Sequence, residues 1–130
     1  MMVFTSDIGA EILSQTEKWH IDGTFKKRPK LFYQILTIWA LYNDELIACA
    51  YSVLPNKLTS TYLSLFEVIK NICNQNGELK LKTVLTDFET ALQNALKLVF
   101  EDVEVKDCWF HFNQAIMRKL FSLGTRYKFY

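Results

Sequence analysis

The sequence is poor in cysteine and has no long hydrophobic run. Its three cysteines are Cys49, Cys73 and Cys108, a small and odd number that does not suit a disulfide framework. No apolar run reaches the roughly 18 residues that suggest a membrane span, and residues 1–10 lack the basic start and apolar centre of a signal peptide. We therefore expect an intracellular protein with no membrane contact, in which Cys49 and Cys73 are small buried hydrophobic residues.

The chain also has little net charge. Its 15 Lys and Arg residues nearly balance its 14 Asp and Glu residues, which leaves +1 at neutral pH. Proteins that hold a long duplex through its phosphates are usually more basic, so this balance disfavours tight DNA binding by the domain alone. Hydrophobic residues are abundant, at 50% of the chain, and 15% of the residues are aromatic. The composition predicts one globular domain with a packed core.

The order of the expected elements predicts an α/β protein. After a helical lead-in within residues 1–17, three apolar stretches are interpreted as strands, at residues 19–25, 31–41 and 46–54. Helical spacing then alternates with two further strands, which gives helices at about 59–76, 88–99 and 110–123 and strands at 81–86 and 103–106. This is the element order of the ribonuclease H-like fold, a mixed five-stranded sheet in the order 3-2-1-4-5 with helices on its faces.

Two aspartates stand where expected strands end. Asp22 stands in the carboxyl half of the first strand, and Asp87 directly follows the fourth. These strands are neighbours in the expected sheet, so both carboxylates should meet at one edge, where paired carboxylates are suitable ligands for Mg²⁺ or Mn²⁺. Two other interpretations stay open. Asp22 with Gly23 is a favoured hairpin-turn dipeptide, and Asp87 is a good N-cap for the helix that follows it.

Two neighbouring side chains also have alternative interpretations. Glu89 falls in the first turn of the expected helix, where an acid suits the helix dipole, and it is also a candidate third metal ligand. His20 shares a strand face with Asp22. It is either an ordinary strand histidine or a side chain that approaches the metal.

Taken in order, these motifs resemble the catalytic domain of Mutator-like element (MULE) transposases, a branch of the DDE superfamily with the ribonuclease H-like fold. The resemblance covers residues 18–125. It rests on IDGTFK at residues 21–26, Pro29, the hairpin to Pro55, Tyr62 and Phe66, TDFETA at residues 86–91, and CWFHFNQA at residues 108–115.

The resemblance implies metal-dependent DNA strand cleavage and transfer in the nucleus. Asp22 and Asp87 match the first two acids of a triad that binds Mg²⁺ or Mn²⁺. The third acid of the family is a glutamate beyond the Cys-x-x-His block, and no Asp or Glu follows Asp107 here. We therefore expect residues 18–130 to be a transposase-like domain, C-terminally incomplete before that acid and inactive on its own. The alternative is a domesticated, non-catalytic module that binds nucleic acid or protein.

Further candidate residues lie nearer the C-terminus and in the first basic turn. Cys108 and His111 have the i, i+3 spacing of the family's Cys-His signature, which suits zinc. A structural zinc needs four ligands, so a packed cysteine with a hydrogen-bonded histidine is the other interpretation. Six basic residues have two interpretations. They are either ordinary solvated surface or, as the resemblance implies, contacts to DNA phosphates. These residues are Lys26, Lys27, Arg28, Lys30, Arg118 and Lys119. The aromatic C-terminal residues predict self-association or dependence on a C-terminal extension.

Overall fold

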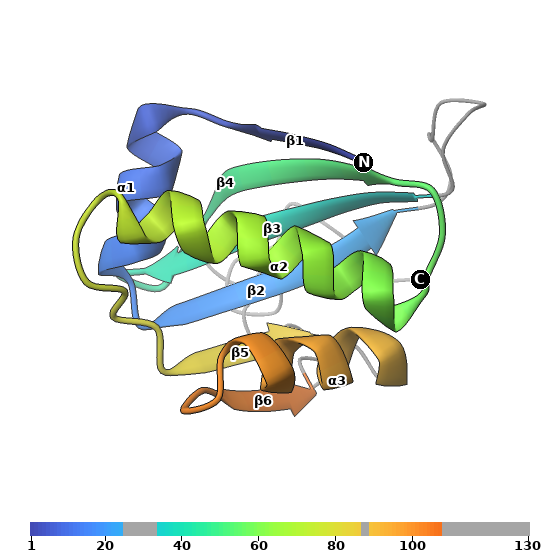
Figure 1. Ribbon diagram of the computed structural model, residues 1–130. Coiled ribbons are helices and arrows are strands. Elements are labelled where there is room, and N and C mark those ends of the chain that lie inside the picture. The colour runs from blue at the N-terminus through green and yellow to red at the C-terminus, as the bar shows by residue number, and fades with distance from the viewer. Residues whose placement is uncertain (25–33, 87–88, 108–130) are drawn as a thin grey trace, which may run out of the picture.

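The computed structural model describes residues 1–24, 34–86 and 89–107 of the chain. In these residues one mixed sheet carries three helices (Figure 1). The elements are, in order, β1 (Met2–Thr5), α1 (Asp7–Gln15), β2 (Lys18–Thr24), β3 (Gln34–Tyr42), β4 (Glu45–Leu54), α2 (Thr59–Asn74), β5 (Thr83–Thr86), α3 (Thr90–Val99) and β6 (Glu104–Asp107).

The sheet has the strand order β1-β4-β3-β2-β5-β6. Its central strand, β2, pairs antiparallel with β3 and parallel with β5, and β6 lies parallel to β5 at the edge. The predicted order of five strands is confirmed, because their predicted sequence 3-2-1-4-5 corresponds to β4-β3-β2-β5-β6. The mixed sheet follows from this chain order, since a hairpin makes antiparallel neighbours and helical crossovers make parallel ones.

The structure corrects the prediction at the N-terminus, where it adds a sixth strand. Met2–Thr5 pairs antiparallel with β4, with Val3 opposite Ser52 and Phe4 opposite Tyr51. Only Val3 of this strand is even half-buried. A short edge strand with exposed side chains on both faces has no hydrophobic alternation, so the sequence pattern pointed only to the helix that follows it.

Helices α2 and α3 cover one face of the sheet (Figure 1). Side chains alternate along a strand, so Trp19 and Ile21 of β2 face the helices and join the apolar core. The partners of these residues on β3 are Ala40 and Ile38, which belong to the same core. His20 lies on the other face of β2, opposite Trp39.

Local signals in the sequence account for the ends of several elements. The side chain of Ser6 accepts a hydrogen bond from the Gly9 amide at 2.9 Å, which caps α1. The β3–β4 turn contains Asn43 and Asp44 with φ angles of 51° and 63°. Both residue types tolerate this left-handed backbone, which two-residue hairpin turns require. The predicted turn at this position is therefore confirmed.

Both described cysteines are buried, as the sequence predicts. Cys49 lies in β4 and Cys73 in α2, and both thiols are free. Burial raises the pKa of each thiol, and for Cys73 burial together with the neighbouring Cys49 raises the pKa to about 12. Both groups therefore stay protonated at neutral pH. No helix in the described ranges is long and apolar enough to cross a bilayer.

Candidate functional site

The carboxyl ends of β2 and β5 lie side by side at the centre of the sheet. Their parallel register runs from Lys18 opposite Thr83 to Ile21 opposite Thr86. Asp22 is the next residue of β2, and Asp87 is the next residue of the chain after β5. Asp87 itself lies outside the described residues. The structure thus places Asp22 on β2 next to the end of β5 that precedes Asp87.

Asp22 belongs to a regular strand. It pairs with Thr37 of β3, while Gly23 pairs with Leu36, and β2 continues to Thr24. The hairpin-turn interpretation of Asp22 and Gly23 is therefore wrong, because both residues take part in sheet pairing. The Asp22 side chain is exposed, so its carboxylate is accessible to ions in solution.

Gly23 stands where β2 and β3 approach closely. A Cβ atom built at Gly23 would lie 3.0 Å from Oε1 of Gln34 and 3.6 Å from Cδ1 of Leu36. The first of these distances is tighter than most real Cβ contacts, and Gln34 is fully buried. The glycine that follows Asp22 therefore makes room for the Gln34 side chain.

Gln34 belongs to a buried polar network at this end of the sheet. Its Nε2 donates to the Tyr62 hydroxyl at 2.7 Å and to the backbone oxygen of Asn56 at 3.3 Å. The Tyr62 hydroxyl in turn donates to Oε1 of Glu89 at 2.7 Å. The network therefore connects β3, the first turn of α2 and the start of α3.

Glu89 occupies the N-cap position of α3, which begins at Thr90. The predicted helix start directly after Asp87 is thus two residues too early in the described chain. The Glu89 backbone oxygen accepts the Gln93 amide at 3.0 Å, so Glu89 does begin the helix, but its side chain makes no cap hydrogen bond. Its carboxylate accepts the Tyr62 hydroxyl instead, a contact that sequence reasoning did not predict.

His20 is buried on the same face of β2 as Asp22, as strand alternation predicts. Its neighbours across the two strand pairs are Trp39 and Leu85. The interpretation of His20 as an ordinary strand histidine stays a prediction.

The donors at this edge suit a hard divalent cation. The carboxylate oxygens of aspartate are ligands that Mg²⁺ and Mn²⁺ prefer, and both described cysteines are buried elsewhere, in β4 and late in α2. Among the described residues no three His, Cys, Asp or Glu side chains come together as a metal site. The remaining predicted site residues lie outside the described ranges, namely Asp87, Cys108, His111, Lys26, Lys27, Arg28, Lys30, Arg118 and Lys119.

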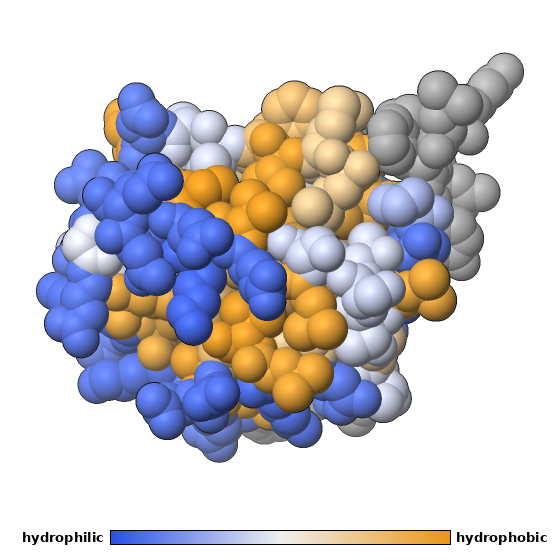
Figure 2. Space-filling model, viewed as in Figure 1, coloured by the Kyte–Doolittle hydropathy of each residue, from blue (hydrophilic) through white to orange (hydrophobic). Residues whose placement is uncertain are grey.

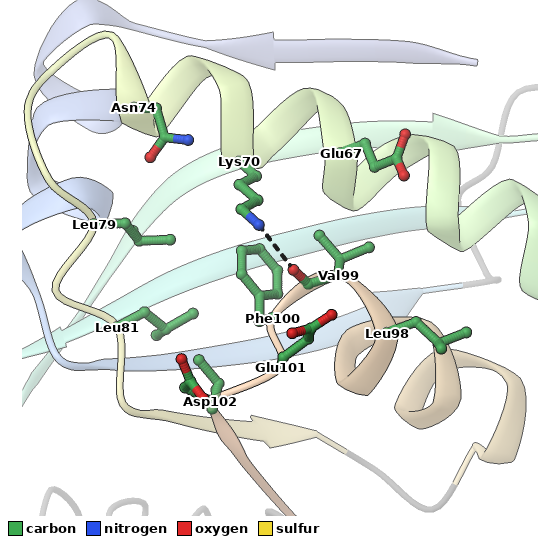
Figure 3. A pocket seen from close by; sticks show the side chains of 11 residues that line it. Glu67, Lys70, Asn74, Leu79, Leu81, Leu98, Val99, Phe100, Glu101 and Asp102 are labelled. Atoms are coloured by element: carbon green, nitrogen blue, oxygen red, sulfur yellow. Dashed lines mark hydrogen bonds between the residues drawn. The ribbon is translucent and has the colours of Figure 1, made fainter.

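An open groove of about 470 Å³ lies away from this edge, beside the C-terminal end of α3 (Figure 3). Nζ of Lys70 in α2 donates to the backbone oxygen of Val99 at 3.1 Å, which satisfies a carbonyl at the end of α3. Glu67, Glu101 and Asp102 also line the groove. Apolar residues gather on this helix-covered face of the molecule (Figure 2). Asp22 is not among the residues that line this groove, so the groove is separate from the edge that carries Asp22.

Comparisons with known proteins agree with this arrangement. The family model of the MULE transposase domain matches residues 18–115. A chain of the cryo-electron-microscopy structure of the simian T-cell lymphotropic virus intasome in complex with PP2A regulatory subunit B56 gamma is similar in structure, with a TM-score of 0.50 and 15% identity. The match covers 90% of this chain and 45% of that chain. No curated protein matches the sequence. The structural likeness shows the fold, which is ribonuclease H-like.

Proposed function

The chain belongs to the MULE transposase domain family, and from this premise we propose that Asp22 and Asp87 are carboxylate ligands of a divalent-metal site for DNA strand cleavage and transfer. Nuclear DNA is the proposed substrate, and the nucleus the proposed location. The comparisons support descent from a transposase. The reaction, the metal and the residues are our proposal for this chain.

One observation supports the site above the others. In the parallel β2–β5 pair, Ile21 lies opposite Thr86, and the two aspartates are the residues that follow this last pair. Ligands in open α/β sheets bind outside the carboxyl ends of the strands. The central position of β2 and β5 in the sheet holds the strand residues that lead to both acids.

Divalent ions held at such a site supply Lewis-acid polarisation of a phosphate and activation of the attacking oxygen. The aspartates would hold the ions through carboxylate oxygens, and the basic residues within 26–30 and at 118–119 would contact the DNA backbone. The sequence contains no Asp or Glu after Asp107. We therefore propose that these 130 residues alone hold two of the three family ligands and cleave DNA very slowly.

Metal binding is the direct test of the site. Mg²⁺ or Mn²⁺ should raise the melting temperature, because an ion bound only by the folded state stabilises it. At a metal concentration of about ten times Kd, we expect a rise of roughly 3–6 °C for a domain of this size. Asp22→Asn and Asp87→Asn should each abolish the rise.

The control is Asp44→Asn in the β3–β4 turn. It also removes one carboxylate, and asparagine accepts the left-handed backbone at this position. This variant should keep the full metal-dependent rise. If the wild type shows no rise, or Asp44→Asn loses it as well, the proposed site is wrong. A nicking assay with Mn²⁺ completes the test, since rapid cleavage that depends on Asp22 would contradict the proposed lack of a third ligand.

A further inference from the structure

The carboxyl ends of β2 and β5 are connected by a chain of buried and half-buried side chains on the helix-covered face. Gln34 touches the position of Gly23, the residue after Asp22, and donates to Tyr62, which donates to Glu89, two residues after Asp87. We propose that Gln34, Tyr62 and Glu89 form a positioning network that sets the separation of the carboxyl ends of β2 and β5. Its role toward a metal rests on the proposed function.

Burial makes this network specific. Gln34 and Tyr62 are both 0% exposed, so water cannot replace a hydrogen bond that one of them loses. Each contact also fixes a direction. The Tyr62 hydroxyl has one proton, and because Gln34 donates to its oxygen, that proton is free to point at Glu89. Because every donor in this chain points toward Glu89, the three side chains cannot exchange donor and acceptor roles.

The three elements that the network joins come from distant parts of the sequence. Gln34 and Tyr62 are 28 residues apart, and Tyr62 and Glu89 are 27 apart. The first turn of α2 is itself held by Asn56, whose Oδ1 accepts the Leu58 amide at 3.1 Å and the Thr61 hydroxyl at 2.6 Å. Tyr62 is therefore presented from a helix turn that is already fixed.

Core packing alone does not account for these residue types. Tyr62 belongs to the apolar core cluster, where a phenylalanine would fill the same ring volume. Burying a hydroxyl and an amide is unfavourable unless their polar atoms find partners. The Tyr62 hydroxyl and Nε2 of Gln34 find them, whereas Oε1 of Gln34 has none among the described residues. Hydrogen-bonded buried groups specify one arrangement of the elements around them. The polar atoms therefore fix the relative positions of β3, α2 and α3 near the carboxyl ends of β2 and β5.

The first test compares two conservative variants of α2. Tyr62→Phe removes the hydroxyl and keeps the ring. The control Ile69→Val removes one methylene from a buried side chain of the same helix. Amide hydrogen exchange is measured on the metal-free proteins at residues 22–24 and 89–93. Tyr62→Phe should accelerate exchange by about 5- to 10-fold at both segments, since each loses a supporting hydrogen bond, and Ile69→Val should not. Acceleration at only one segment, or equal acceleration in both variants, would overturn the proposal.

The second test measures Mn²⁺ affinity by electron paramagnetic resonance. Tyr62→Phe and Glu89→Ala should each weaken binding by several-fold, whereas Glu89→Gln should retain it, because the amide oxygen still accepts the Tyr62 hydroxyl. If Glu89→Gln weakens binding as much as Glu89→Ala, the carboxylate acts through its charge and the positioning role is wrong. If wild-type binding does not depend on Asp22, the proposed function fails, while hydrogen exchange still decides whether the network exists.

Discussion

At its amino end strand β2 contributes Trp19 to an apolar core, whereas at its carboxyl end it carries the exposed Asp22 beside buried polar side chains. The Trp19 ring meets Phe100 edge-on with ring centroids 5.6 Å apart, and its indole N–H donates to the Leu13 oxygen at 3.1 Å. At the carboxyl end, Gln34 and Tyr62 hold the surroundings through hydrogen bonds. One seven-residue strand is thus supported by two kinds of interaction.

The difference indicates a division of roles along the strand. Apolar burial is strong but not directional, so it suits the end whose task is to stabilise the sheet. Hydrogen bonds contribute little net stability but fix angles and distances, so they suit the end where side chains must be placed. We expect substitutions at the amino end to change the free energy of unfolding, and substitutions at the carboxyl end to change geometry and metal binding.

The largest expected effect is at Trp19. Trp19→Ala leaves a large cavity in the core and should lower the free energy of unfolding by about 3–5 kcal/mol, measured by urea denaturation. The control is Trp39→Ala on β3, a half-buried tryptophan on the other face of the sheet, which should cost clearly less. Equal losses in the two variants would contradict the assignment of stability to the helix-covered core around Trp19.

The second effect is a loss of stability at high pH. Helix α2 runs from the carboxyl end of β2 toward its amino end (Figure 1), and Cys73 lies in its last turn. Burial raises the pKa of this thiol from 9.0 to about 12, so the unfolded chain releases its proton at lower pH than the folded chain. The contribution is fully present below about pH 9. As the pH rises toward 12 it is lost, by up to about 1.4 kcal/mol per pH unit.

Cys73→Ala removes this titration and gives the control. Both proteins lose stability as other groups titrate at high pH, so the measured quantity is the difference between their slopes. The free energy of unfolding should fall more steeply with pH in the wild type than in the variant. Parallel slopes would show that the pKa of the Cys73 thiol is the same in the folded and unfolded chain. Water would then reach this end of the core.

The third effect is at Gly23, which lies close to both the apolar Leu36 and the hydrogen-bonded Gln34. Gly23→Ala places a Cβ atom 3.0 Å from Oε1 of Gln34, and two hydrogen bonds hold that side chain in place. We expect a loss of about 1–2 kcal/mol from overpacking and a larger proportional loss of Mn²⁺ affinity. An unchanged Mn²⁺ affinity in a folded Gly23→Ala protein would show that the Gln34 contact does not position the Asp22 strand end.

Sequence reasoning predicted the fold well because its signals are local. The apolar run of β3 and the Asn43–Asp44 turn specify the hairpin, and helical spacing specifies α2. The pairing of β2 with β5 followed from the element order, which matches the ribonuclease H-like fold. The edge strand Met2–Thr5 was missed because its side chains are exposed on both faces, and the start of α3 was misplaced because Asp87 looked like an ordinary cap.

The candidate site was predicted only in part. Asp22 stood out because an acid falls near the carboxyl end of an apolar strand, but Gln34 carried no such signal at the start of β3. The contacts of Tyr62 with Gln34 and Glu89 span 28 and 27 residues and follow no strand or helix period. A contact of this kind depends on how the elements pack together, which short-range patterns do not encode.

The smallest expected effect is at Asp22 in metal-free protein. The side chain is exposed, and Asp22→Asn preserves its size and its strand pairing with Thr37. In the presence of EDTA, the free energy of unfolding should therefore stay within about 0.5 kcal/mol of the wild type. If Asp87 lies beside it as proposed, removing one of two like charges should shift stability upward within that range. Urea denaturation with and without Mn²⁺ separates the two states. A loss above about 1 kcal/mol in EDTA would mean that Asp22 supports the fold directly, and the division between a stabilising end and a positioning end of β2 would no longer hold.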